Sequence, residues 1–425
     1  MATRKATLFE RHLRPRVEAA LTDTPVVLVV GPRQAGKTTL CGQVAEKTGA
    51  RLLSFDDAAT LASATADPAG FIAALEGPVV LDEIQKAPAL LPAIKHAVDR
   101  RREAGRFLLT GSASVLALPK IAESLAGRME VLTLWPLSQG ELLNREEGFL
   151  GELFRSAAPR LATAGETRAE LIERALRGGY PEAVQRTDPE RRRAWFGSYV
   201  TTILQRDVRD LADIAGLADL PRVLQVLAAR TYSMANAAEL SRTIGIPLTT
   251  LKRYLALLEH TFLIRSVPAW TGNRGLRVIR TPRVLIPDTG LLADLAGLTS
   301  ERLAVDSPAI GPLLESFVAS ELLKQISVSR TRIDLLHFRT HAGREVDFVL
   351  ESASGGVVGI EVKAAATVSA AHTRGLAALR EAAGRKFHRG VLLYGGRESL
   401  PFGRDIWAMP ISSLWAVAGG ARPSR

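Results

Sequence analysis

Cysteine is almost absent from this sequence, which has a single one, Cys41. A lone cysteine excludes an internal disulfide and any zinc site that needs several cysteine ligands. The 7 histidines are scattered and follow none of the spacings that are typical of metalloproteases or of a catalytic triad. We therefore assign no metal to cysteine or histidine, and we expect a protein suited to a reducing compartment.

Long apolar runs are also missing. A stretch such as VVLVV at 26–30 is far too short to cross a bilayer. The first residues, MATRKATLFERHLRPRVEAA, are charged throughout and contain no apolar stretch like that of a secretion signal. We expect a cytoplasmic protein without a membrane partner.

Acidic residues are outnumbered, with 44 of them against 55 lysines and arginines, and the formal net charge is +11. Such an excess is compatible with a polyanionic partner such as DNA. Because net charge reports on non-specific binding and not on the fold, an arginine-rich composition explains the excess equally well.

Between 26 and 134, short apolar runs alternate with helical patterns. Apolar strands with helices between them predict a parallel sheet that is covered on both faces. The runs are VVLVV (26–30), RLLSF (51–55), PVVLD (78–82), RFLLT (106–110) and MEVLTL (129–134).

The segment GPRQAGKT at 31–38 fits the phosphate-binding pattern G-x-x-x-x-G-K-[ST], directly after an apolar run and before a helical pattern. Its glycines permit backbone angles that turn successive amides toward phosphate oxygens, and the next helix points its N-terminus at the same anion. Lys37 would supply charge to the outer phosphates, and the Thr38 hydroxyl would hold Mg²⁺. We expect ATP with Mg²⁺ to contact Gly31, Pro32, Arg33, Gln34, Ala35, Gly36, Lys37, Thr38 and Thr39.

The segment VVLDEIQ at 79–85 ends an apolar run with two carboxylates. We expect Asp82 to bind the Mg²⁺ through water and Glu83 to polarise the attacking water as general base. The alternative is a pair of acidic residues that simply opens a loop. At this distance from the phosphate-binding segment, the catalytic interpretation is favoured.

Two further polar positions are candidates for the same site. The next run ends in LLTGSAS (108–114), where Thr110 or Ser112 would sense the outer phosphate, although a cluster of serine and threonine also caps helices. Arg128 would sense the nucleotide in its own chain or act as an arginine finger toward a neighbouring copy in a homo-oligomer. A solvated surface arginine is the alternative.

The motifs GPRQAGKTTL, VVLDEIQ, LLTGSAS and SLAGRMEVLTLWPLS resemble those of a large prokaryotic group of AAA-type ATPases with a C-terminal domain of unknown function. The resemblance extends over most of the chain, through segments such as IPDTGLLADLAG, LLESFVASEL and HFRTHAGREVDFVLE. It implies a sheet with the strand order 5-1-4-3-2 in the domain 1–134, followed by a helical lid at 135–230.

The segment NAAELSRTIGIPLTTLKRYLALLEHTFLIRSV (236–267) reads as a helix, a turn, a second helix and a strand. This pattern predicts a winged helix-turn-helix within 231–304, whose second helix would enter the DNA major groove while basic residues contact phosphates. Winged helices also serve as protein-docking modules, which remains the alternative. The residues expected to contact DNA are Thr249, Thr250, Lys252, Arg253, Arg274 and Arg277.

Two strand patterns near the end, GREVDFVL (343–350) and GIEVKA (359–364), are separated by the turn-like ESASGG. Folded as a hairpin, they would place Asp347 opposite residue 360 or 361, with Glu361 and Lys363 on one face. Two carboxylates can hold Mg²⁺, and a neighbouring lysine can help to deprotonate a water.

This arrangement is similar to that of PD-(D/E)XK nucleases, which implies a nuclease-like α/β domain over 305–425. The preceding helical segment LLESFVASELLKQ adds Glu315, where that fold often places another acidic ligand, so Glu315, Asp347 and Glu361 would hold Mg²⁺. The expected proline before the first acid is Val346 here. The alternative is a structural ion pair of Lys363 with Asp347 or Glu361, because charged groups in a partly buried strand need partners.

Together these patterns predict an α/β protein that binds and hydrolyses ATP, binds DNA and has a possible Mg²⁺-dependent nuclease site. The alternative is a nucleotide-switched protein-docking regulator that does not cleave DNA. The residues expected to carry catalysis are Glu83, Lys37, Asp347, Glu361 and Lys363.

Overall fold

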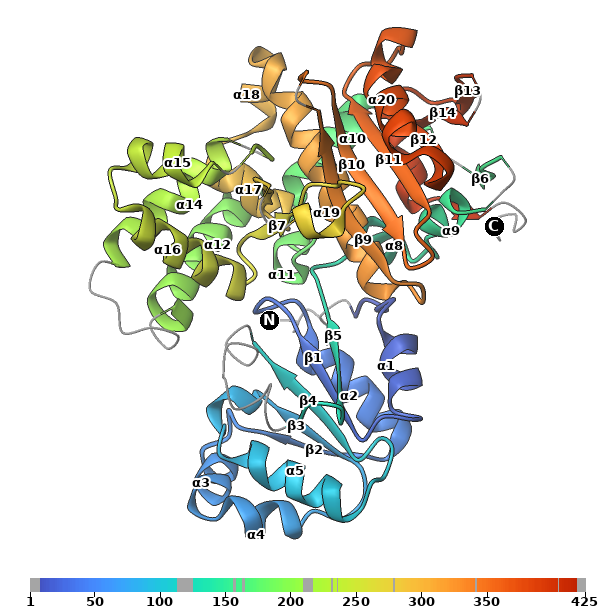
Figure 1. Cartoon of the computed structure of the whole chain (residues 1–425). Helices are drawn as coiled ribbons and strands as arrows, with labels where there is room; N and C mark the ends of the chain where they lie inside the picture. The colour runs from blue at the N-terminus through green and yellow to red at the C-terminus, as the bar shows by residue number, and fades with distance from the viewer. Residues whose placement is uncertain are drawn as a thin grey trace.

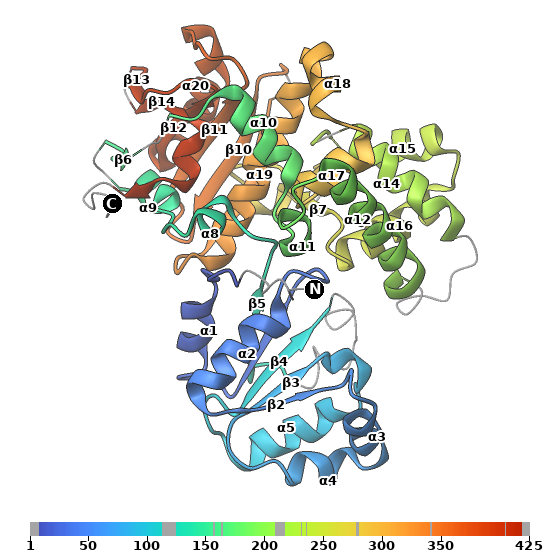
Figure 2. The same cartoon turned by 180° about the vertical axis from the view of Figure 1, so that it is seen from behind.

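The structure of the chain is a computed structural model. It describes residues 8–112, 125–155, 158–162, 165–208, 217–230, 232–234, 236–277, 280–340, 342–403 and 405–418. The two larger β-sheets of the described residues lie in separate parts of the molecule, and the chain passes from one part to the other after β5 (Figures 1 and 2). Among the described residues, no helix is long and apolar enough to cross a membrane.

The first sheet has five parallel strands in the order β2-β3-β4-β1-β5, which confirms the predicted parallel sheet and the order that the resemblance implies. Its strands are β1 (Val26–Val30), β2 (Arg51–Ser54), β3 (Val79–Asp82), β4 (Phe107–Gly111) and β5 (Met129–Thr133). The helices of this part are α1 (Arg14–Ala20), α2 (Lys37–Thr48), α3 (Ala58–Ala66), α4 (Pro68–Ala73) and α5 (Leu90–Arg100).

The central strand β1 is buried on both faces because every residue in it is apolar and successive side chains point to opposite faces. Val27 and Val29 pack with α1 and α2 on one face. Val26, Leu28 and Val30 pack with α3, α4 and α5 on the other. The sheet thus holds the end of β1 rigidly at the place where the phosphate-binding segment begins.

After β5 the chain is mostly helical up to the second sheet. The helices are α8 (Gln139–Leu143), α9 (Phe149–Leu153), α10 (Arg168–Arg177), α11 (Pro181–Val184), α12 (Pro189–Thr202), α14 (Leu220–Ala229), α15 (Ala237–Ile244), α16 (Leu248–His260), α17 (Thr289–Ala296), α18 (Ser300–Val305) and α19 (Ile310–Val328). A π-helical turn, η2 (Ile203–Asp207), extends α12.

The region predicted to be a winged helix contains α15, α16 and a two-stranded antiparallel ribbon of β7 (Arg265–Val267) and β8 (Arg283–Leu285), with the turn η4 (Arg274–Arg277) between the strands. Gly245 joins the two helices with a φ of +81°, a left-handed angle that favours glycine. The identity of this region as a winged helix stays a prediction.

The second sheet has six strands in the order β13-β14-β12-β11-β10-β9. Helix α19 packs against β9 and β11, and the helix α20 (Arg374–Ala383) packs against β10, β11 and β12. The strands are β9 (Ile333–Arg339), β10 (Glu345–Ser352), β11 (Val357–Lys363), β12 (Phe387–Tyr394), β13 (Leu400–Pro401) and β14 (Ile406–Pro410), and a small ribbon pairs β6 (Leu161–Ala162) with β15 (Val417–Ala418).

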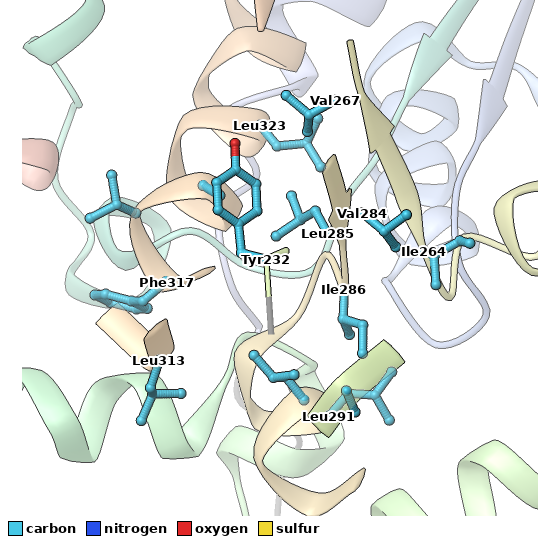
Figure 3. Close-up of a cluster of buried hydrophobic side chains, with 14 of the residues drawn as sticks. Tyr232, Ile264, Val267, Val284, Leu285, Ile286, Leu291, Leu313, Phe317 and Leu323 are labelled. Atoms are coloured by element: carbon cyan, nitrogen blue, oxygen red, sulfur yellow. The ribbon is translucent and has the colours of Figure 1, made fainter. Parts of the chain in front are cut away.

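A single hydrophobic core extends from Trp135 to Trp415 and includes side chains from the predicted lid, winged helix and last domain. Figure 3 shows part of it, where Leu285 of β8 lies beside Tyr232 and where Leu313 and Phe317 come from α19. The boundaries expected near 230 and 304 therefore fall inside one shared core.

Candidate functional site

The phosphate-binding segment lies between the end of β1 and the start of α2. Gly36 caps α2 with a φ of +94°. A Cβ atom at Gly31 would lie 2.1 Å from the Leu134 carbonyl oxygen, so only glycine fits there. Lys37 is buried, which lowers the pKa of its amine, and its Nζ donates to the carbonyl oxygens of Gly31 (3.1 Å) and Pro32 (3.0 Å).

Asp82 is the centre of a network of hydroxyl groups at the carboxyl ends of three strands. The Thr38 hydroxyl donates to its Oδ1 at 3.0 Å, and Thr110 donates to the same oxygen at 2.6 Å. Ser54 donates to its Oδ2 at 3.1 Å. A hydroxyl beside a carboxylate at a phosphate-binding loop is a ligand set that Mg²⁺ prefers, so these residues fit the metal of a Mg²⁺–nucleotide.

Glu83 follows Asp82 in a left-handed conformation with a φ of +59°. Its backbone N–H donates to the Thr110 hydroxyl at 3.0 Å, and its carboxylate accepts a hydrogen bond from the side-chain amide of Gln85, in the short helix η1 (Ile84–Lys86). A positive φ at a residue other than glycine is a strained conformation, and such strain is typical of functional sites. The left-handed conformation places Glu83 at the edge of a cavity of about 650 Å³ that Lys37 and Thr38 also line.

The far wall of this cavity comes from α12, with Trp195 and Tyr199, and from the segment before α1, with Phe9. The Tyr199 hydroxyl donates to the Arg33 carbonyl oxygen at 3.3 Å, so α12 touches the phosphate-binding segment directly. None of these wall residues was expected from the sequence, because no motif marks them.

Two expected nucleotide contacts are placed differently. Thr110, rather than Ser112, donates a hydrogen bond to Asp82. Ser112 is buried one residue beyond the end of β4, where its N–H donates to Gln85 Oε1 at 3.4 Å.

Arg128 lies at the opposite end of the sheet from the phosphate-binding segment. Its carbonyl oxygen accepts from the Val26 N–H, and its guanidinium pairs with Asp99. The expectation that Arg128 senses the nucleotide in its own chain is therefore wrong, because the whole length of β1 separates the two.

The hairpin of β10 and β11 brings the second group of predicted residues together. Phe348 lies opposite Ile360, and the Val362 N–H donates to Asp347 Oδ2 at 2.9 Å. Lys363 Nζ pairs with Glu361 Oε1 at 2.8 Å. The ion pair that forms the structural alternative is thus present.

The acidic cluster formed by Glu315, Asp347 and Glu361, with Lys363 beside them, also has contacts from outside the hairpin. Arg283 of β8 pairs with Asp347 at 3.5 Å. Glu361 Oε2 is buried and has no hydrogen-bond partner among the described residues. Within those residues, no three His, Cys, Asp or Glu side chains are grouped to hold a metal, so Glu315, Asp347 and Glu361 do not form the predicted three-carboxylate site.

The acidic cluster changes the proton affinities of its members. Burial, with the nearby Asp347 carboxylate, raises the pKa of Glu315 to about 8 and that of Glu361 to about 7. The cluster therefore holds protons at a pH where an exposed carboxyl would be ionised.

The residues predicted to contact DNA fall into two sets. Thr249, Lys252 and Arg253 of α16 are exposed, and Thr250 is half-buried. Arg274 and Arg277 each pair with the buried Glu351 at 2.6 Å, so both already have a partner within the chain.

A cavity of about 720 Å³ lies next to that pair and is lined by further arginines. These additional arginines are Arg265, Arg280 and Arg332.

We predict that the acidic cluster makes stability depend on pH. The folded-state pKa of Glu315 lies near 8 and its ordinary value is 4.5, so between these values the folded chain holds more protons than the unfolded one. Stability should fall as pH rises through this window and level off above it. In Glu315→Gln the difference in stability between pH 5 and 8 should shrink by at least about 1 kcal/mol, the worth of one pKa unit. Urea unfolding at both pH values measures this.

The exposed carboxyl of Glu381 in α20 offers a matched control. Glu381→Gln should leave the pH dependence unchanged. Parallel pH curves for the unaltered chain and Glu315→Gln would show that Glu315 keeps an ordinary pKa.

Comparison with protein families places an AAA domain at residues 23–143. Residues 168–302 match a domain of unknown function, DUF8612, and residues 310–414 match another, DUF4143. The uncharacterized proteins Rv2008c of Mycobacterium tuberculosis and Mb2031c of Mycobacterium bovis are each 32% identical over 406 residues, which cover 95% of this chain and 84% of theirs.

Solved structures give more distant likenesses. The Walker-type ATPase PABY2304 of Pyrococcus abyssi is 16% identical with a TM-score of 0.41, over 69% of this chain and 97% of that one. The RuvB Holliday junction branch migration motor of Thermotoga maritima is 18% identical with a TM-score of 0.29, over 61% and 90%.

Proposed function

The chain belongs to the same family as the two mycobacterial proteins and carries an AAA-type ATPase domain, and we propose that it binds and hydrolyses ATP with Mg²⁺ at residues 31–38. The observation that carries the proposal is the contact of Thr38 Oγ1 with Asp82 Oδ1 at 3.0 Å. It joins the phosphate-binding segment to the carboxylate at the end of β3, so both halves of a Mg²⁺–phosphate site lie together.

The roles of the side chains follow from their placement. The backbone amides of 31–38 and the start of α2 bind the phosphates, and Lys37 contributes positive charge to the outer ones. When bound, Mg²⁺ neutralises charge on the phosphate oxygens. Thr110 holds both Asp82 and the Glu83 backbone, so Glu83 is fixed where it can orient a water and accept its proton.

We predict that Lys37→Ala removes ATP hydrolysis by weakening ATP binding, because the outer phosphates lose their charged partner. Glu83→Gln should still bind ATP but lower kcat by about 10²–10⁴-fold, the usual contribution of a general base. Steady-state phosphate release and calorimetric ATP titrations with Mg²⁺ measure both effects. Lys47, exposed at the other end of α2, provides the control, and Lys47→Ala should behave like the unaltered chain. Failure of the unaltered chain to bind ATP would overturn the proposal.

We propose DNA as the partner of this ATPase, on the basis of the arginine-lined cavity beside β7 and β9. Arg265 and Arg280 line this cavity together with Arg332. Two arginines on the single carboxylate of Glu351 leave one positive charge in excess there. The exposed face of α16 provides a second basic surface through Lys252 and Arg253.

We predict that duplex or single-stranded DNA stimulates ATP turnover, and that the stimulation weakens steeply between low and physiological salt. The double variant Arg265→Ala/Arg280→Ala should reduce the slope of log affinity against log salt by about 1 for each phosphate that an arginine no longer neutralises. The matched control is Arg100→Ala/Arg101→Ala, which removes the same charge from exposed positions at the end of α5. Equal slopes for the two double variants would contradict DNA binding in this cavity.

The acidic cluster is the place to test nuclease activity. Its support is the convergence of Asp347, Glu361 and Lys363, with one buried Glu361 oxygen left without a partner among the described residues. We predict that any Mg²⁺- or Mn²⁺-dependent nicking of plasmid DNA disappears in Lys363→Ala while ATP hydrolysis persists. Absence of nicking by the unaltered chain, with either metal, would leave Lys363 and Glu361 as a structural ion pair.

A nucleotide-switched docking regulator is the second candidate. It is supported by the continuous core that joins the predicted lid to α19 and the second sheet, since partner binding there would respond to the nucleotide without DNA chemistry. In a homo-oligomer, Arg128 would serve as an arginine finger for the nucleotide site of a neighbouring copy. ATP turnover that ignores every form of DNA would favour this second function.

A further inference from the structure

Arg11 is a buried arginine outside both the phosphate-binding motif and the matched AAA domain. It lies before α1, and only 6% of its surface is exposed. Its guanidinium donates to three acceptors on three separate segments. Nε bonds to Glu141 Oε1 at 3.0 Å, NH1 to the Ala35 carbonyl oxygen at 2.5 Å and NH2 to the Trp135 carbonyl oxygen at 2.7 Å.

The bond to Ala35 acts on the phosphate-binding segment itself. The Ala35 carbonyl and the Gly36 N–H belong to one rigid peptide plane, so a donor that fixes the carbonyl also fixes the direction of the N–H. Ala35 is fully buried, so its carbonyl depends on a partner within the protein. Glycine at 36 offers little resistance to rotation of this plane, and an outside restraint therefore matters.

The packing around Gly36 also indicates that Arg11 restrains the Ala35–Gly36 peptide. A Cβ atom added there would lie 3.4 Å from Arg11 NH1, so the guanidinium lies directly against the residue that caps α2. The amide of this residue is one of those that would face the phosphates of a bound nucleotide.

Glu141 holds Arg11 in place from the other side. Its Oε1 also accepts from the His12 N–H at 2.7 Å, and its Oε2 accepts from the Ser138 N–H at 2.9 Å. Burial would raise the pKa of Glu141, but Arg11 and these hydrogen bonds keep that pKa below its usual range. The carboxylate therefore stays charged and keeps the guanidinium oriented toward Ala35.

We propose that Arg11 is a positioning residue of the nucleotide site, which fixes the Ala35–Gly36 peptide so that the Gly36 N–H points at the phosphates. It also ties this peptide to the connection after β5 through Trp135. The inference rests on the proposed function, because it presumes that residues 31–38 bind a nucleoside triphosphate.

The test must separate positioning from stability. Arg11→Ala alone leaves the buried Glu141 carboxylate without its positively charged partner, which is strongly destabilising. The double variant Arg11→Met/Glu141→Gln removes that charge and still leaves the Ala35 carbonyl without the arginine. Arg11→Lys is a second, conservative variant, whose single ammonium cannot reach three diverging acceptors. The control is Arg14→Ala, which removes a half-buried arginine paired with Glu18 on α1.

Circular dichroism with thermal unfolding confirms that each full-length variant is folded, and titration with ATP and ADP gives the dissociation constants. In Arg11→Met/Glu141→Gln both dissociation constants should rise about tenfold or more, since a charge-assisted hydrogen bond no longer orders the loop. The KM for ATP should rise with little change in kcat, because the Gly36 amide binds phosphate in both the ground and the transition state. A merely structural defect would instead lower kcat with the active fraction and leave KM unchanged.

Unaltered ATP affinity and KM in the folded double variant would overturn the inference and leave the ATPase proposal intact. If the double variant does not fold, Arg11→Lys decides, and unaltered affinity there has the same meaning. Failure of the unaltered chain and Arg14→Ala to bind ATP would overturn the proposed function instead.

Discussion

A buried polar junction anchors the connection after β5 to helix α19, where the chain enters the second part of the protein. The Gln139 N–H donates to Glu321 Oε2 at 2.8 Å, and Lys324 Nζ bonds both Glu321 Oε1 (2.7 Å) and the Leu137 carbonyl oxygen (3.0 Å). Glu321 is fully buried. Buried charges are tolerated only when they are paired and hydrogen-bonded, and loss of either partner leaves an expensive isolated charge. The junction therefore fixes the connection after β5 against α19.

Helix α19 extends this constraint to the second sheet. Glu315, near its start, belongs to the acidic cluster, and Glu321 and Lys324 lie at the junction. One helix thus contacts both the acidic cluster and the connection that leads from the phosphate-binding segment's sheet. On the other side of the junction, the connection after β5 touches the phosphate-binding segment, since Leu134 packs against Gly31 and Trp135 accepts from Arg11. The phosphate-binding segment and the acidic cluster are linked through contacts of the connection after β5 and of α19.

The strands of the first sheet, the phosphate-binding segment and one hairpin were predicted from patterns of residues that are neighbours along the chain. The apolar runs became the five parallel strands because a run such as 26–30 leaves no polar side chain to face water on either side. Gly31, Gly36, Lys37 and Thr38 were found because a phosphate loop needs its residue types at set positions within one short segment. The hairpin of β10 and β11 followed from its turn residues, within one residue of the observed register.

Contacts between distant segments could not be predicted in this way. Arg11 and Glu141 are 130 positions apart, and neither belongs to a motif. Tyr199 reaches Arg33 across 166 positions. Nothing in the residues near Arg274 or Arg277 indicated that both would pair with Glu351. Side chains from the three regions predicted at 135–230, 231–304 and 305–425 also share one core, a contact between distant segments that no local pattern indicates.

The sequence by itself determined the phosphate-binding loop, the carboxylates at the end of β3 and the order of strands and helices, because each depends on residues that are neighbours along the chain. Only the tertiary structure decided which side chains meet: Arg128 lies far from the loop, Arg11 lies against it, and Lys363 pairs with Glu361. The physical reason is that hydrogen bonds and ion pairs depend on distances of a few ångströms, which packing sets between segments far apart in the sequence.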